Sequence, residues 1–264
     1  MKHWMKISLW ILVSIGTFVL MALVYSNQKT KVLKPPHILI EVDGENAFLT
    51  ENELKLRLQR DNLIYPGQQF QNLDIDKVEN YILNMNEVRT AKVYTQIGSD
   101  WNIQLKLRRP IARIFNRLNE SFYLDMSGNT MLPSNLHTAR VLVVNGDIPD
   151  QLNGKNVEEI NSNPEWKKKF RLDDIHHIAA VVCEDPFLES LVAQVHLNEE
   201  GDFILIPQVG GHSINFGSAK NREEVERKFE KLKIFYTHGM PYEGWRKYKE
   251  VIVKFRDQIV CVKK

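Results

Sequence analysis

One short segment brings together side chains of the types that bind metal ions. The sequence Asp-Asp-Ile-His-His at residues 173–177 offers two carboxylates and two imidazoles, which are common ligands of Zn²⁺ and other transition metals. Adjacent residues on a helix do not share a face, so only His177 with Asp173 or Asp174 can hold one ion. An apolar stripe runs through the same stretch. We interpret the segment as the solvated face of a helix and predict no metal site.

The remaining residues that catalysis often uses have simple structural explanations. His212 and His238 lie at glycine-containing turns and have no acidic neighbour in the sequence. Asp125 precedes a Gly-Asn turn, where aspartate commonly accepts local backbone hydrogen bonds. The sequence contains no phosphate-binding glycine loop, no nucleophile elbow and no paired-histidine metalloprotease motif. We therefore predict a protein that is not an enzyme and uses no cofactor or metal.

Two cysteines, Cys183 and Cys261, are too few for a disulfide framework or a zinc site. We expect both to pack as small core residues, as free cysteines commonly do. Pairing of the two in an oxidising compartment stays open, because their spacing in the sequence does not decide it.

The composition fits a globular protein of one large or two small domains. The chain has 264 residues, of which 43% are hydrophobic and 26% charged, both ordinary fractions. A net charge of +2 gives no reason to expect a nucleic-acid partner.

The first residues predict a membrane anchor. Residues 7–25 carry no charge and are flanked by Lys2, Lys6 and Lys29. This length suits one helical span, whereas a secretory signal has a shorter apolar stretch and a small-residue cleavage site. We predict an uncleaved anchor, a short cytoplasmic tail and an exported bulk, although lysines on both sides make charge counting nearly even. Residues 1–37 are then tail, anchor and a linker stiffened by prolines.

The next residues, 38–108, have the pattern of a small two-layer domain. A strand at residues 38–42 is followed by a helix whose start is marked by Thr50 and Glu53, a capping box, with Leu49 and Leu54 as a hydrophobic staple. A second helix is predicted from residue 75, and strands are predicted at residues 88–97 and 101–107, joined by a turn at residues 98–100. The order strand-helix-helix-strand-strand predicts a three-stranded sheet with both helices on one face.

Residues 109–264 predict a larger, β-rich domain with helices. Strands are expected at "IARIFN", "ESFYLDMSGNTM" and "ARVLVVNGD", and three more in residues 191–217. Asn163-Pro164 is expected to begin a helical region that buries Trp166, Phe170, Ile175, Ile178 and Val182. A further helix, capped by Asn221 and Glu224 and stopped at Gly239, buries Val225, Phe229, Leu232 and Tyr236.

The last residues, "VIVKFRDQIVCVKK", read as strand sequence at a place where many chains fray. We predict that residues 251–255 complete the sheet of this domain, that "RDQ" forms a turn or bulge, and that residues 259–262 form a short edge strand. Lys263 and Lys264 would then protect that edge against indiscriminate pairing.

The ordered blocks of the sequence resemble the FtsQ/DivIB family of bacterial division proteins. "IEVDGENAFLTENEL" resembles the opening of that family's POTRA domain. "LKLRRPIARI" resembles its domain junction through Arg108, Pro110 and Ala112, with Leu107 where the family often has an acidic or amide residue. The later blocks are similar too: "YLDMSGNTM", "GDFILIPQVGGHSINFG", "KFEKLKIFY" and "VIVKFRDQIVC".

The resemblance implies an α+β protein with one transmembrane helix, a POTRA domain, and a β domain that ends in an edge strand. It implies a non-catalytic scaffold in the inner membrane at the division septum, which binds FtsB- and FtsL-like partners and acts indirectly on the septal synthases FtsW and FtsI. The partner contact in the family is similar to strand addition. The implied partner-binding residues are Phe255, Ile259, Val260, Cys261 and Val262, with charge pairing from Arg222, Arg227 and Lys231.

Two other functions are alternatives to this one. A POTRA-bearing component of an envelope polypeptide-translocation system would need a barrel of many alternating strands of about 10 residues. The residues after Pro110 include helical stretches and are too few for a large pore. An anchored exported enzyme would need a catalytic group of residues that the sequence lacks.

Overall fold

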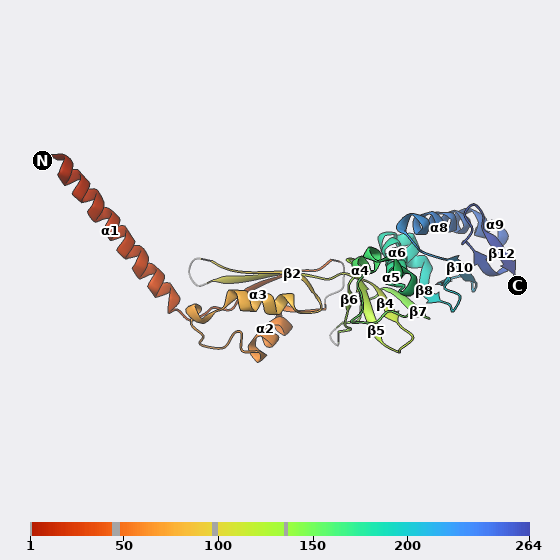
Figure 1. Ribbon diagram of the computed structural model, residues 1–264, viewed down its shortest axis with the longest axis horizontal. Helices are drawn as coiled ribbons and strands as arrows, with labels where there is room; N and C mark the ends of the chain where they lie inside the picture. The colour runs from red at the N-terminus through yellow and green to blue at the C-terminus, as the bar shows by residue number, and fades with distance from the viewer. Residues whose placement is uncertain (1, 44–47, 97–99, 135–136) are drawn as a thin grey trace. The chain divides into compact units, whose positions relative to one another are not determined.

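The computed structural model of the protein describes residues 2–43, 48–96, 100–134 and 137–264 (Figure 1). Residues 1–42 and 49–107 form one compact unit, and residues 43–48 and 108–264 form a second. The turn predicted at residues 98–100 lies largely outside the described residues. We call the two units the POTRA-like unit and the β unit.

The N-terminal helix α1 spans Lys2–Lys29. Within it, Ile7–Val24 has a mean hydropathy of 2.5, and none of this stretch is buried against the rest of the protein. Exposing an apolar helix of this length to water is unfavourable, so the helix fits a single-pass membrane anchor.

The POTRA-like unit has the predicted order of elements. Strand β1 (His37–Glu41) pairs in parallel with β3 (Trp101–Leu107), and β2 (Val88–Thr95) pairs with β3 in antiparallel fashion, so that β3 is central. Helices α2 (Glu51–Arg60) and α3 (Ile75–Leu83) and the short 3₁₀ helix η1 (Phe70–Asn72) complete the unit. The alternation predicted for β3 is confirmed: its apolar side chains are buried in one core with those of α2 and α3.

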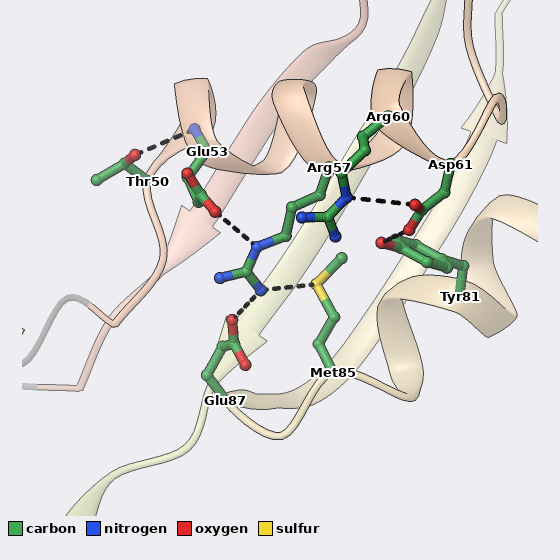
Figure 2. A network of polar contacts seen from close by, with 8 residues as sticks. All are labelled: Thr50, Glu53, Arg57, Arg60, Asp61, Tyr81, Met85 and Glu87. Carbon is green, nitrogen blue, oxygen red and sulfur yellow. Dashed lines mark hydrogen bonds and ion pairs between the residues drawn. The ribbon is translucent and has the colours of Figure 1, made fainter. Parts of the chain in front are cut away.

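Helix α2 begins at the predicted residue but uses only half of the predicted cap. The hydroxyl of Thr50 accepts a hydrogen bond from the Glu53 backbone at 3.3 Å, and Leu49 and Leu54 are buried. The Glu53 carboxylate instead accepts from Arg57 Nε at 2.8 Å, and Arg57 also donates to Glu87 at 2.6 Å (Figure 2). Arg57 therefore ties α2 to the segment that leads into β2.

The β unit is built on one mixed sheet of nine strands. Its order is β12-β11-β10-β9-β8-β7-β4-β5-β6. The pairs β4·β7, β7·β8 and β10·β11 are parallel, and the other neighbours are antiparallel. The strands are β4 (Pro110–Phe115), β5 (Ser121–Asp125), β6 (Thr130–Met131), β7 (Leu142–Gly146), β8 (Val192–Leu197), β9 (Phe203–Pro207), β10 (Ser213–Gly217), β11 (Tyr248–Ile252) and β12 (Val260–Lys263).

Helices supply the two long crossovers that parallel pairing requires. Between β7 and β8 lie α4 (Val157–Ser162), α5 (Pro164–Lys169), α6 (Leu172–Glu184) and α7 (Pro186–Leu191). Between β10 and β11 lie α8 (Arg222–Ile234), the π-helical turn η2 (Phe235–Gly239) and α9 (Met240–Glu243). One apolar core joins the sheet to α6 and α8. A smaller cluster, Phe48 with Tyr123, Met131 and Ala139, is separate from it.

Two helix boundaries differ from the prediction. The helical region that begins at Pro164 is two helices, because the Asp150 carboxylate accepts hydrogen bonds from the backbone of Arg171 and Leu172 and starts α6 afresh. Trp166 and Phe170, at the break, are only half-buried. Gly239 does not stop the second helix: the chain continues through the π turn into α9, which ends at Gly244, whose φ is 93°.

Candidate functional site

Strand β12 is the last strand of the sheet and carries three of the eight predicted partner-binding residues, Val260, Cys261 and Val262, with Ile259 directly before it. It pairs with β11 through Val251↔Cys261 and Ile252↔Val260. Among the described residues, no strand pairs with its other side. An edge of this kind offers backbone N–H and C=O groups to an added strand.

The side chains of this edge segment divide between the two faces of the sheet. Ile259 and Cys261 are half-buried and pack against the main core. Val260 and Val262 are 38% and 41% exposed. An added strand at this edge would therefore meet two valine side chains on the open face, while Ile259 and Cys261 hold β12 on the domain.

The connection from β11 to β12 is held in place by Lys231 of α8. Its ammonium donates to the carbonyl oxygens of Val253 and Arg256, each at 3.1 Å, and to that of Phe255. Partial burial, together with the charges of Arg227 and Lys228, lowers the pKa of Lys231. Lys231 therefore positions the edge, and Phe255 lies in the connection with its side chain 41% exposed.

Arg222 and Arg227 differ in whether their charges are already paired with carboxylates. Arg222 contacts Glu184 of α6 and donates to Glu226 at 2.7 Å, and these hydrogen bonds raise its pKa. Arg227 is exposed and has no ion pair or hydrogen bond within the described part of the chain. Of the three predicted cations, Arg227 has the charge most accessible to a partner.

The edge lies in a strongly basic stretch. Residues 245–264 hold seven lysines and arginines against two acidic residues, a balance of +5. Within this stretch Lys254 forms an ion pair with Asp202 at 3.2 Å. An acidic segment would therefore be attracted to this edge.

A buried polar pair near the edge escaped the sequence analysis. His212, interpreted as a turn residue, is buried, and its Nε2 lies 2.6 Å from the hydroxyl of Tyr236. Burial raises the pKa of Tyr236 and lowers that of His212. Tyr236 also packs against Trp245, with ring centroids 5.8 Å apart. No short-range pattern links residues so far apart in sequence, so only the fold reveals the pair.

The Asp-Asp-Ile-His-His segment is not the solvated face that its sequence predicted. Asp173 and Asp174 are buried at the start of α6. The ring of His176 lies 3.1 Å from the carbonyl of Met126, and His177 lies 3.0 Å from that of Ala219. No cluster of three or more metal-ligating residues occurs in the described ranges.

Asp125 makes the local hydrogen bonds that were predicted and one long-range bond that was not. Its Oδ1 accepts from the backbone of Ser127 at 2.9 Å and of Asn129 at 2.8 Å. Its Oδ2 accepts from Arg108 at 2.9 Å. The junction arginine therefore neutralises a buried turn aspartate, which is a structural role.

The two cysteines are separate free thiols. Cys183 lies 3.1 Å from an Arg109 guanidinium nitrogen, and burial raises the pKa of its thiol. Both contact the main core from half-buried positions, as expected for small apolar residues.

The architecture defines a class of protein: one apolar N-terminal helix that fits a membrane anchor, then a β-α-α-β-β unit, then a β-rich domain with a final edge strand. Comparison with family models agrees. Residues 36–106 match a POTRA-like domain, and residues 109–262 match the family described as FtsQ/DivIB, C-terminal related.

Because the second match covers more than half of the chain, the protein belongs to the FtsQ/DivIB family. It is a division-related POTRA protein of a generally non-catalytic family. No curated protein matches the chain closely enough to count as a relative.

Proposed function

We propose that the protein is a non-catalytic scaffold of the division machinery that binds FtsB- and FtsL-type partners by strand addition at β12. Through them it would link early and late division proteins and control septal peptidoglycan synthesis by FtsW and FtsI. The observation that carries the proposal is the outer side of β12, with which no strand of the described ranges pairs and where Val260 and Val262 are exposed. Backbone pairing supplies affinity there, and side chains on the open face supply specificity.

The basic balance of residues 245–264 supports an acidic partner segment. Arg227 would pair with it directly. Arg222 and Lys231 would contribute mainly by stabilising the domain near the edge. Arg222 already donates to Glu184 and Glu226, and Lys231 already donates to three backbone carbonyls. Phe255, Ile259, Cys261 and Val262 complete the proposed contact region.

A proline substitution tests the strand-addition step. Val260→Pro removes a backbone N–H that faces β11 and so disturbs the edge strand that a partner would extend. We expect affinity for an FtsB-type partner to fall at least tenfold in a pull-down or titration, with the circular dichroism of the variant unchanged. If the folded variant binds as the wild type does, the partner does not add to this edge.

The matched control places proline in a turn of the same unit. Glu199 occupies the second position of a turn closed by the hydrogen bond from Gly201 N–H to the carbonyl of Asn198, at 3.1 Å. Proline is favoured at that position of a type I turn. Glu199→Pro should therefore leave both folding and partner binding unchanged.

The cellular role has its own test. Under the proposal the anchor lies in the inner membrane with the N-terminus in the cytoplasm, the two units lie in the periplasm, and a fluorescent fusion gathers at midcell. Depletion should give filaments that fail to septate. Normal division with lost protein secretion would instead favour a translocation component that uses the POTRA-like domain.

A further inference from the structure

A cavity of about 490 Å³ lies in the β unit. It is formed where α5 ends, where α6 begins, and by the turn between β8 and β9 and the loop after β10. This volume is in the range of small-ligand sites. Six charged residues line it: Lys167, Lys168, Arg171, Asp173, Asp174 and Lys220.

The cavity has a buried carboxylate that lacks a donor. Asp173 is only 3% exposed, and its Oδ1 has no hydrogen-bond partner among the described residues. Asp174 beside it is also buried, with a single ion pair to Arg171 at 3.7 Å. Burial and the charge of Asp173 raise the pKa of Asp174 to about 7. A buried carboxylate without a donor is costly, so this pair calls for a ligand group that donates hydrogen bonds or carries positive charge.

The rim of the same cavity has two lysines whose ammonium groups make no ion pair. Lys167 and Lys220 are exposed, and neither side chain has an ion pair or hydrogen bond in the described part of the protein, although the charge of Lys167 partly opposes the rise in the pKa of Asp174. Lys168 pairs with Glu165 at 2.8 Å, outside the cavity lining. Lys167 and Lys220 at the rim can therefore bind a carboxylate, whereas buried Asp173 needs a hydrogen-bond donor.

Simple ions satisfy only one half of this arrangement. A divalent cation needs several oxygen ligands, and the described residues hold no group of three acidic, histidine or cysteine side chains. The lysines on the rim would also repel it. A simple anion would bind the lysines and leave Asp173 without a donor.

We propose that this cavity binds the zwitterionic head of an amino acid, with its ammonium on Asp173 and Asp174 and its carboxylate on Lys167 and Lys220. An amino acid is a small ligand that carries both charges, on groups attached to the same carbon atom. The site is remote in sequence from β12 and its evidence is separate from that for strand addition.

The test measures binding of glycine and of D- and L-alanine to the detergent-solubilised full chain by calorimetry. We expect saturable binding with Kd about 1 mM or tighter, in the range of weak small-ligand complexes. Acetate, which carries only the carboxylate, and methylamine, which carries only the ammonium, should bind at least tenfold more weakly.

Two variants address the two halves of the site. Asp173→Asn and Lys220→Gln should each weaken amino-acid binding at least tenfold, whereas Glu158→Gln on α4 and Lys77→Gln on α3 should not change it. Lys220 is exposed, so Lys220→Gln remains a fair test even if Asp173→Asn fails to fold.

Three results would overturn the proposal. The first is the absence of saturable amino-acid binding. The second is equal binding of acetate, which would define a plain anion site. The third is a thermodynamic coupling between Asp173 and Lys220 in a double-mutant cycle on unliganded protein, which would mean that the lysine itself neutralises the carboxylate. Partner binding at β12 is measured separately, so failure here leaves that proposal standing.

Discussion

The two units of the protein place their ionisable groups in opposite ways. In the POTRA-like unit the charged network around Arg57 (Figure 2) is partly exposed, and the buried polar residue among those described there is the uncharged Gln68. In the β unit charged side chains lie in the interior. These include Asp125, Asp150, Asp173, Asp174 and Lys228.

The difference lies in how the connections are held. In the POTRA-like unit, the exposed side chains of Thr50 and Asp74 cap the starts of α2 and α3. In the β unit two long crossovers must return to parallel strands, and buried polar side chains hold the points where they turn. Asp150 begins α6, and Lys228 donates to the Ser218 carbonyl before α8. Buried polar groups stabilise only while every bond is made, so the β unit should respond more strongly to single substitutions.

The largest effect is expected for Lys228→Ala. Lys228 is 2% exposed, bonds Glu224 at 2.5 Å and the Ser218 carbonyl at 2.7 Å, and lies over the ring of Phe216. Removing it leaves a cavity and an unpaired, largely buried carboxylate, at a cost of about 4 kcal/mol. Hydrogen exchange of the full chain should show lost protection throughout the β unit and unchanged protection in the POTRA-like unit.

Arg227→Ala, one residue earlier on α8, is the control for that substitution. Because Arg227 is exposed, its removal should change the unfolding free energy by no more than about 0.5 kcal/mol. Equal destabilisation by the two variants would contradict the structural role of Lys228.

The next effect is expected for Asp125→Ala. The substitution leaves two backbone N–H groups and Arg108 without their acceptor, at a cost of about 2–3 kcal/mol. The loss should again be confined to the β unit, beginning at the β5–β6 turn. Protection of that turn at wild-type level would show that its hydrogen bonds do not depend on Asp125.

A smaller effect concerns pH. The folded pKa of Asp174, about 7, is raised above its unfolded value, so its protonation stabilises the fold at low pH and that contribution is lost as pH rises through 7. Between pH 6 and 8 the loss is on the order of 1 kcal/mol. Burial also raises the pKa of Asp150, to about 6, with the same sign.

The measurement compares urea unfolding of wild type and Asp174→Asn at pH 6 and pH 8. Half-buried His176 and buried His212 have lowered pKa values and act in the opposite direction, but they are present in both proteins and cancel in the difference. If the unfolding free energy of Asp174→Asn changes between pH 6 and pH 8 as much as that of the wild type, Asp174 is ionised throughout this range.

The smallest effect is expected in the POTRA-like unit. The Arg57 side chain is 23% exposed, and Arg57→Ala should cost about 1 kcal/mol by loss of its bonds to Glu53 and Glu87. Arg60→Ala, whose ion pair to Asp61 is well exposed, should cost less than about 0.5 kcal/mol. If Arg57→Ala destabilises the protein as much as Lys228→Ala, the contribution of a charged group to the unfolding free energy does not depend on its burial in the way that the two units suggest.

Sequence patterns alone predicted the elements whose signal is local. The alternation of β3, the Thr50 cap and the apolar face of α8 were all visible in short windows and are confirmed. A final edge strand was predicted at residues 259–262 from their pattern and from the resemblance to a family, and it is observed at Val260–Lys263, while the strand predicted at residues 251–255 is β11 at Tyr248–Ile252. That Arg222 and Lys231 are already bonded within the domain did not follow, because their acceptors lie far away in sequence.

Residue type and spacing therefore determined this protein's apolar N-terminal helix and its element order, since both depend on apolar periodicity and local turn chemistry, and the resemblance of its sequence blocks indicated the family. Only the tertiary structure decided where the charges lie. The sequence predicted Asp173 and Asp174 to be solvated, but both are buried. It predicted His212 to be a turn residue, but His212 is buried and forms a hydrogen bond with Tyr236. Burial is set by whichever distant elements pack over a side chain, and no local pattern records them.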